Sequence, residues 1–278
     1  MIRIVLQGRT GNHLFQYALG RVLAKKYQVP IVLDASWFNS EGWAQVSHFL
    51  SLPLQAEVVR PCSLGSRMLR KITGKHHWEF LSVPVFREKP ADQSFDARFL
   101  ECPSDCVLFG YFQTPRYFGE IAEELREELR SLLNSVCSSS EIHRELAKPG
   151  TVAVHVRRGD YLQHSVFKVC DEEYYRASIN QMRKEVSGAK FFIFSDDPAW
   201  CRSTFCDDDQ TIVDSGEAGN NPLYDLHLMS LAAHHIIANS TYSWWSAWLA
   251  QSSTQRVIMP DRWYAGEIIA PIDEKKWF

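Results

Sequence analysis

Residues 152–161 read Val-Ala-Val-His-Val-Arg-Arg-Gly-Asp-Tyr, an apolar run typical of a buried β-strand that ends in two adjacent arginines. Such a strand brings Arg157 and Arg158 to the carboxyl edge of a parallel sheet, where open α/β folds bind their ligands. Two neighbouring guanidinium groups repel each other, so the pair favours an anion that joins them, although Asp160 could neutralise one of the two. The guanidinium fork matches phosphate oxygens, and a diphosphate is therefore the expected ligand.

Strand-like and helix-like segments alternate along the chain. The first half opens with a strand at 2–6, a glycine turn at 8–12 and a helical pattern to residue 27, which is the start of a Rossmann-like unit. Residues 36–82 read as irregular. A strand at 107–112 precedes a helix at 114–133, for which Thr114 is the expected N-cap. Strands are further predicted at 151–156, 190–194, 211–213, 235–238 and 256–259, and helices at 171–186, 222–233 and 241–251.

The polar segment 134–140 is a plausible domain boundary. We therefore expect an α/β protein with two Rossmann-type domains, residues 1–140 and 141–278, and mostly parallel sheets. The net charge of −3 argues against a general nucleic-acid surface. The seven cysteines include no Cys-x-x-Cys pair, which favours reduced thiols over disulfides or a zinc site.

The chain begins directly with a strand and has no long apolar run, so a cytoplasmic protein is expected, at most peripheral to a membrane. The basic segment 67–77 has three interpretations: an acceptor loop, a solvated surface, or a contact with anionic lipid.

Three further junctions between a strand and a helix are candidate sites. The turn at 8–12 places backbone amides at a helix start, which suits phosphate, although most such turns are only tight turns. Asp196 and Asp197 follow a predicted strand and could bind ribose hydroxyls or a guanine edge, and one of them could cap the next helix. Residues 239–248 carry hydroxyl groups at a helix start and form a second candidate phosphate cradle.

Several segments together resemble the α-1,2-fucosyltransferases of glycosyltransferase family 11. The matching segments, in chain order, are 8–18, 110–113, 155–161, 194–197 and 237–249. The His-x-Arg-Arg-Gly-Asp-Tyr and Asn-Ser-x-x-Ser-Trp-Trp motifs are the most specific. The resemblance implies a GT-B-like enzyme with a cleft between its domains, which moves L-fucose from GDP-L-fucose, with inversion and without a metal or other cofactor, to the 2-hydroxyl of a terminal galactose.

On this resemblance, Arg157 and Arg158 would hold the diphosphate, and Asp160 and His13 are the candidate bases. The candidate donor-binding residues are Gly11, Asn12, His155, Ser195, Asp196, Ser240, Thr241 and Ser243. The carboxyl-terminal domain would bind the donor, and the amino-terminal domain would face the acceptor. The sequence departs from the family pattern at Arg9, Thr10, His13 and Ser246. Transfer from another nucleotide sugar and a non-catalytic nucleotide- or glycan-binding role remain the alternatives.

Overall fold

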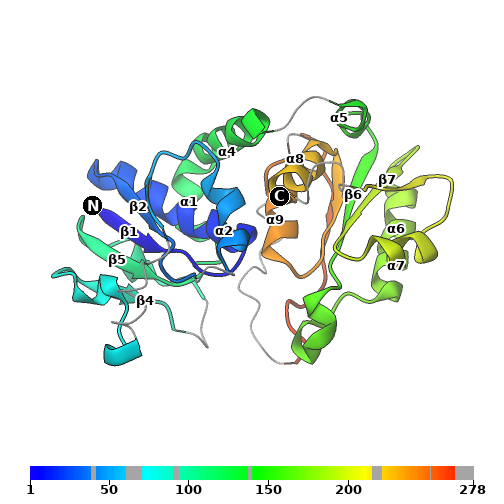
Figure 1. Ribbon diagram of the computed structural model, residues 1–278. Coiled ribbons are helices and arrows are strands. Elements are labelled where there is room, and N and C mark those ends of the chain that lie inside the picture. Colours follow the sequence, from blue (N-terminus) through cyan, green and yellow to red (C-terminus); the bar gives the residue numbers. More distant parts are fainter. Residues whose placement is uncertain are drawn as a thin grey trace. The chain divides into compact units, whose positions relative to one another are not determined.

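The computed structural model describes residues 1–38, 42–60, 71–89, 94–136, 140–214, 221–250 and 252–266. The chain divides into two compact units, Met1–Glu128 and Leu129–Phe278. Each unit is built on a five-stranded sheet whose paired strands all run parallel (Figure 1). Two α/β units with parallel sheets confirm the predicted fold class. The division falls inside helix α4 (Ala122–Val136), before the polar segment at which the sequence suggested a boundary.

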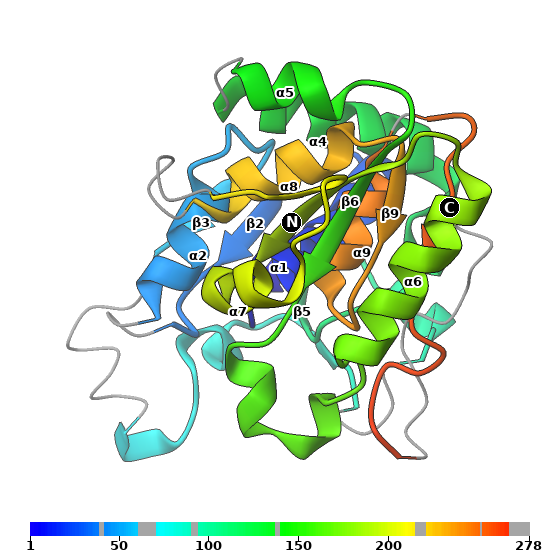
Figure 2. The ribbon, with the colours of Figure 1, turned by 90° about the vertical axis from the view of Figure 1, so that its right-hand side faces the viewer.

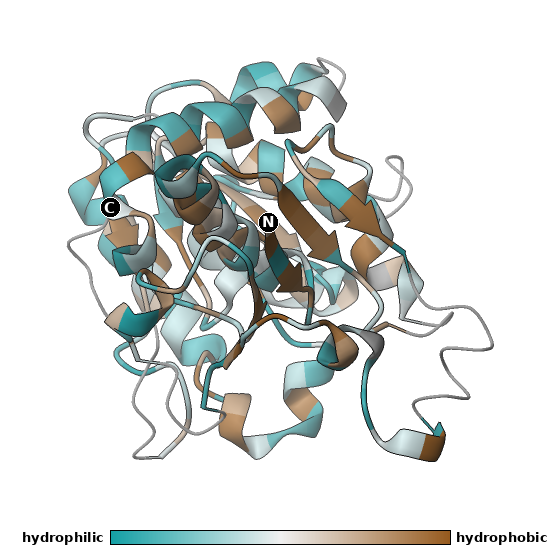
Figure 3. Cartoon of the chain, turned by 90° about the vertical axis from the view of Figure 1, so that its left-hand side faces the viewer, coloured by the Kyte–Doolittle hydropathy of each residue, from teal (hydrophilic) through white to brown (hydrophobic). Residues whose placement is uncertain are grey.

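The sheet of the first unit has the strand order β3-β2-β1-β5-β4. Its elements are β1 (Ile2–Val5), α1 (Thr10–Tyr27), β2 (Ile31–Asp34), α2 (Trp43–Leu50), β3 (Glu57–Val59), β4 (Val85–Arg87), β5 (Cys106–Phe109) and the first half of α4, with 3-10 turns at His77–Phe80, Ala97–Phe99, Pro115–Tyr117 and Gly119–Ile121. Helix α1 packs so closely on one face that a Cβ at Gly20 would come within 2.3 Å of Ile4. On the other face Trp78 packs on Val5 and Val107. The strands are largely apolar for this reason (Figure 3).

The sheet of the second unit has the order β10-β9-β6-β7-β8, with β6 at its centre. Its elements are α5 (Glu141–Leu146), β6 (Thr151–Val156), α6 (Glu172–Glu185), β7 (Lys190–Ser195), α7 (Pro198–Thr204), β8 (Gln210–Ile212), α8 (Pro222–Leu231), β9 (His234–Ile236), α9 (Thr241–Trp248) and β10 (Val257–Ile258), with 3-10 turns at Asp160–Gln163 and Ser165–Phe167. Helices α6 and α7 cover one face of β6, and α5 and α8 cover the other (Figure 2). Every residue of β6 is buried, as the apolar run predicts.

Two local predictions differ from the structure. Residues 36–82 were expected to be irregular, yet they contain α2 and β3, which are too short to show a periodic pattern. The helix predicted over 114–133 begins instead as two 3-10 turns that end before Ala122, and only then becomes α4. Thr114 does cap the first of these turns, because its hydroxyl accepts a hydrogen bond from the amide of Arg116. In the described part of the chain no helix is long and apolar enough to cross a bilayer.

Candidate active site

The carboxyl end of β6 carries the two arginines, as predicted. Strands β6 and β7 pair in parallel with Val156 opposite Ser195, so the residues that follow them, Arg157 and Asp196, leave the sheet side by side. Arg157 Nη1 lies 2.7 Å from Asp196 Oδ2. The other carboxylate oxygen of Asp196 accepts a hydrogen bond of 2.8 Å from the backbone amide of Arg158. One aspartate therefore ties the two arginines to the neighbouring strand.

Both guanidinium groups have carboxylate partners of their own. Arg157 Nη2 donates to Asp160, and Arg158 Nε donates to Asp197 over 3.1 Å. From the sequence, only one arginine was expected to have a carboxylate partner, namely Asp160. The ion pair between Arg158 and Asp197 shows that both arginines have one. Two arginines and three aspartates carry a formal charge of −1 together. The arginine side chains are mostly buried, with 17% and 23% of their surface exposed, which strengthens these interactions.

The two guanidinium groups differ in the donors that remain. Arg157 uses both terminal nitrogens on carboxylates. Arg158 uses only Nε, and in the described part of the chain its two terminal nitrogens have no hydrogen-bond partner. An incoming diphosphate could therefore bind Arg158 directly, whereas at Arg157 it must compete with Asp160 or Asp196. We call five residues together the arginine–aspartate cluster: Arg157, Arg158, Asp160, Asp196 and Asp197.

Gly159 is required for this arrangement. A Cβ at Gly159 would lie 2.7 Å from Asp196 Oδ2, closer than real Cβ contacts come. Any larger residue would push the Asp196 carboxylate away from Arg157 and from the amide of Arg158. The glycine in the Arg-Arg-Gly-Asp sequence thus allows the carboxylate to approach the backbone.

Trp200 supports Arg158, a contact that sequence reasoning missed. The guanidinium carbon of Arg158 lies 3.9 Å from the centre of the Trp200 ring, in a cation–π contact. The amide of Trp200 donates to Asp197, which caps α7, as expected for one of the two aspartates. A tryptophan in the first turn of a helix gives no sign in the sequence of the direction in which its ring points.

Three predicted donor-binding residues support the site from inside the fold. His155 Nδ1 lies 2.9 Å from Ser243 Oγ, which also accepts a hydrogen bond from the amide of Ala238. Burial, assisted by the charge of Arg157, lowers the pKa of His155 to about 4, so the ring is neutral at pH 7. Ser195 Oγ accepts a hydrogen bond from the amide of Asp197. His155 and Ser243 thus connect β6 and the end of β9 to α9, and Ser195 fixes the turn that follows β7.

The loop between β9 and α9 brings the other hydroxyl groups to the same edge of the sheet. Ser240 is buried at the N-cap position of α9, and Thr241 begins the helix. Tyr161 donates to the carbonyl of Asn239, and the Asn239 side chain donates to the carbonyl of Trp263. These bonds fix the loop next to the segment that carries Asp160. The start of α9 is therefore positioned at the edge where β6 and β7 end, as the predicted second cradle requires.

In the first unit, the predicted glycine turn lies between β1 and α1. Gly8 has a φ of +74°, and a Cβ there would lie 2.1 Å from the Asn12 side chain. The side-chain amide of Gln113 donates to Asn12 Oδ1 over 2.8 Å, which fixes the Asn12 side chain. Gly11 is buried in the first turn of α1. The turn is thus held from the segment that follows β5 as well as from its own helix.

His13 is not where a base or an acceptor contact is expected. Its side chain is fully buried, it packs on Phe38 and Phe49, and neither ring nitrogen has a hydrogen-bond partner in the described part of the chain. Burial lowers the pKa of His13 to about 3. The structure therefore places this side chain away from solvent, which a position in the first turn of a helix does not reveal from the sequence.

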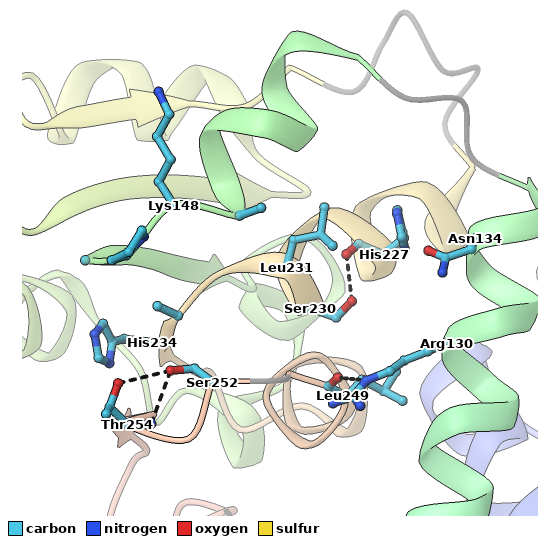
Figure 4. Close-up of a pocket in the computed structure, with 14 residues that line it drawn as sticks. Arg130, Asn134, Lys148, His227, Ser230, Leu231, His234, Leu249, Ser252 and Thr254 are labelled. Carbon is cyan, nitrogen blue, oxygen red and sulfur yellow. Dashed lines mark hydrogen bonds between the residues drawn. The ribbon is translucent and has the colours of Figure 1, made fainter.

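A pocket of about 480 Å³ lies in the second unit (Figure 4). It is lined by residues at the starts of β6 and β9, among them Gly150 and His234, and so opens at the opposite edge of the sheet from the arginine–aspartate cluster. Burial lowers the pKa of His227 to about 4, with a smaller contribution from His143. No predicted site residue lines this pocket. Among the described residues, no three His, Cys, Asp or Glu side chains form a group that could hold a metal ion.

Comparison with known proteins relates the chain to glycosyltransferases. The model of the family "Glycosyl transferase family 11" matches residues 70–278. An alpha-1,2-colitosyltransferase of Escherichia coli is 28% identical over 98% of this chain and 96% of its own. A galactoside 2-alpha-L-fucosyltransferase, Sec1 of Mus musculus, is 32% identical over 91% of this chain and 66% of its own. The crystal structure of fucosyltransferase NodZ from Bradyrhizobium superposes with a TM-score of 0.54 at 16% identity, covering 90% of this chain and 93% of that one.

The superposition supports the predicted GT-B-like fold, and the family match covers the segments that carry the two arginines, the aspartate pair and the start of α9. The chain belongs to glycosyltransferase family 11 and is a fucosyltransferase-like glycosyltransferase.

Proposed function

We propose that this enzyme transfers L-fucose from GDP-L-fucose to the 2-hydroxyl of a terminal galactose, with inversion and without a metal. The observation that carries the proposal is the pair of mostly buried arginine side chains at the carboxyl end of β6, in a chain of family 11. Among its relatives, the name of the mouse protein states galactoside 2-alpha-L-fucosyl transfer. The carboxyl-terminal unit is the proposed donor domain, and the amino-terminal unit the proposed acceptor side.

In this proposal the arginines stabilise the leaving group. As the bond to fucose breaks, the sugar becomes oxocarbenium-like and negative charge develops on the departing GDP. Arg158 has two terminal nitrogens ready to donate to the diphosphate, and the amides at the start of α9 add the positive end of a helix dipole. Fixed guanidinium groups and amides then take the place that a metal ion has in other nucleotide-sugar transferases.

Donor binding should rearrange the arginine–aspartate cluster. Because the cluster is formally −1, a diphosphate gains little there unless a carboxylate leaves. Asp160 is the carboxylate most able to leave: its side chain is 40% exposed, against 25% for Asp196, which also binds the amide of Arg158. We assign the binding of the nucleoside to Asp196, which follows β7. We assign to Asp160 the role of leaving Arg157 when the diphosphate binds.

The same exchange would supply the base. A carboxylate displaced from Arg157 by the diphosphate becomes a stronger acceptor for the proton of the attacking galactose hydroxyl. The arrangement favours Asp160 over His13, because His13 is fully buried. Ser240, Thr241 and the turn at Gly11 and Asn12 are proposed to flank the donor, while His155, Ser195 and Ser243 hold the surrounding loops in place.

The test is to incubate the enzyme with GDP-fucose and lactose. We expect equal amounts of GDP and a fucosylated trisaccharide, with an α-1,2 linkage shown by NMR. The variant Arg202→Lys changes a surface ion pair with an aspartate of the same unit, and it should give the same products as the wild type. GDP release without trisaccharide would refute lactose-type acceptors, and the absence of both products would refute the donor.

A second donor is favoured by one observation. The Escherichia coli colitosyltransferase aligns with almost the whole chain. A direct competition between GDP-fucose and a colitosyl donor, read by product mass, separates the two candidates. Preferred incorporation of colitose would replace the fucosyl assignment and leave the diphosphate site unchanged.

A further inference from the structure

Three aromatic side chains of the first unit form a stack that runs from its core to its surface. Trp78 is fully buried, His76 is half-buried, and Trp37 has 36% of its surface exposed. The rings of Trp78 and His76 have centroids 5.2 Å apart and lie within 15° of parallel. The rings of His76 and Trp37 have centroids 4.9 Å apart and lie within 20° of parallel. The exposed indole is therefore held in a fixed orientation by two rings beneath it.

The stack lies at the edge of the sheet where a ligand is expected. Trp37 follows the end of β2, and its ring contacts that of Phe109, the last residue of β5, at 5.3 Å. Strand β1 lies between β2 and β5 and ends at Val5, which pairs with both Asp34 and Phe109. Trp37 thus reaches across the carboxyl end of β1, the strand that leads into the Gly8 turn.

A charged pair accompanies the stack. Arg87, the last residue of β4, donates to Glu79, and its guanidinium lies 4.9 Å from the Trp78 ring and 5.0 Å from the Phe109 ring. Its side chain is 45% exposed. In the described part of the chain, Arg87 Nε and Nη1 have no hydrogen-bond partner, so they can donate to hydroxyl groups brought to the exposed edge of the stack.

We propose that Trp37 is the platform on which the acceptor sugar packs, with Arg87 donating to its hydroxyl groups. This inference rests on the proposed function and names the surface that recognises its acceptor. One face of a galactopyranose presents adjacent C–H groups, which pack on an aromatic ring, while its hydroxyl groups point outward to polar partners. Because the stack already fixes the indole, binding orders little additional protein.

The experiment compares Trp37→Ala with Trp37→Phe and with Val58→Thr. Val58 is an exposed apolar residue of the same unit, with 40% of its surface accessible, and has no part in the stack. The measurements are the KM for lactose, the KM for GDP-fucose, the hydrolysis of GDP-fucose without acceptor, and saturation-transfer NMR of lactose with the enzyme. The last reports which protons of galactose lie closest to the protein, whether or not transfer occurs, and the variants assign that contact to Trp37.

For Trp37→Ala we expect a rise of about tenfold or more in the KM for lactose, as loss of one aromatic contact implies. The KM for GDP-fucose and the hydrolysis rate should stay within about twofold, Trp37→Phe should recover much of the loss, and Val58→Thr should match the wild type. The NMR signal from the galactose C–H face should disappear in Trp37→Ala.

An unchanged KM for lactose and unchanged NMR contacts in Trp37→Ala would overturn the platform while leaving the fucosyltransferase assignment in place. A loss of GDP-fucose hydrolysis in the same variant would also overturn it, since it would show general damage. A wild-type enzyme that hydrolyses GDP-fucose but neither binds nor fucosylates lactose would refute both the platform and the galactoside acceptor. A wild-type enzyme that binds lactose through Trp37 but leaves GDP-fucose intact would refute only the proposed donor.

Discussion

Replacing Arg157 with lysine separates the charge of the side chain from its shape. Lysine keeps the positive charge but donates from one point, whereas the Arg157 fork reaches Asp160 and Asp196 from two nitrogens. In the donor complex the same fork is proposed to hold the diphosphate. The variant should therefore lose at least one charge-assisted hydrogen bond that strengthens as the leaving group develops its charge.

A hydrogen bond to a charged group contributes about 2–3 kcal/mol in a mostly buried site. The loss of one such bond in the transition state lowers kcat/KM by about 30- to 150-fold. The assay is GDP release with lactose as acceptor, together with the Kd for GDP measured by calorimetry. We expect the larger change in kcat, because the bond strengthens as charge develops on GDP.

Arg183→Lys is the control for loss of stability. Arg183 also bridges two aspartates, Asp207 and Asp209, and its side chain is 30% exposed, but it lies on α6 near the start of β8, away from the carboxyl edge. Both lysine variants should lower the melting temperature by similar small amounts, and only Arg157→Lys should lose activity. Turnover within threefold of wild type in Arg157→Lys would refute the fork contact with the diphosphate.

Four further outcomes follow from the site. Asp160→Asn removes a negative charge that competes with the diphosphate, so GDP should bind more tightly while transfer to lactose falls; weaker GDP binding would contradict the exchange. Gly159→Ala should weaken GDP binding and lower the melting temperature, because the new Cβ meets Asp196 at 2.7 Å, and a second change, Asp196→Ala, should restore part of the melting temperature. His13 has a folded pKa of about 3, so below pH 6.5 the unfolded chain binds a proton that the folded chain does not, and the free energy of unfolding falls as pH is lowered. His13→Leu should reduce that slope by about 1.4 kcal/mol per pH unit between pH 6 and 4, measured by urea titration, and should retain transfer activity. EDTA should leave the rate of GDP release unchanged; inhibition that added Mg²⁺ reverses would refute metal independence.

The sequence predicted the strands that are buried and the helices that are long. The apolar run that ends at Val156 identified β6, and the helix predicted from residue 171 is α6, which Asp171 caps by accepting a hydrogen bond from the backbone amide of Tyr174. Strands β3 and β4, each of three residues at an edge of its sheet, were missed, whereas the equally short edge strand β8 was predicted because strands and helices alternate regularly in that half of the chain. Such short edge strands depend on pairing with a neighbour, which a local pattern does not contain.

The sequence predicted which residues follow the strands of the candidate site but not how they pair. It placed Arg157 and Asp196 each directly after a predicted strand, and the structure shows that the two strands are neighbours. The sequence did not show that both arginines would be held by carboxylates, nor that Trp200 would lie under Arg158. The buried ring of His13 was missed for the same reason, because contacts between distant segments decide the direction of a side chain.

The most direct test of the diphosphate site is a crystal structure of this enzyme with GDP. We expect diphosphate oxygens within about 3 Å of the terminal nitrogens of Arg157 and Arg158, with Asp160 moved away from Arg157. A complex in which GDP binds elsewhere, and both arginines keep all the aspartate contacts described above, would contradict this expectation.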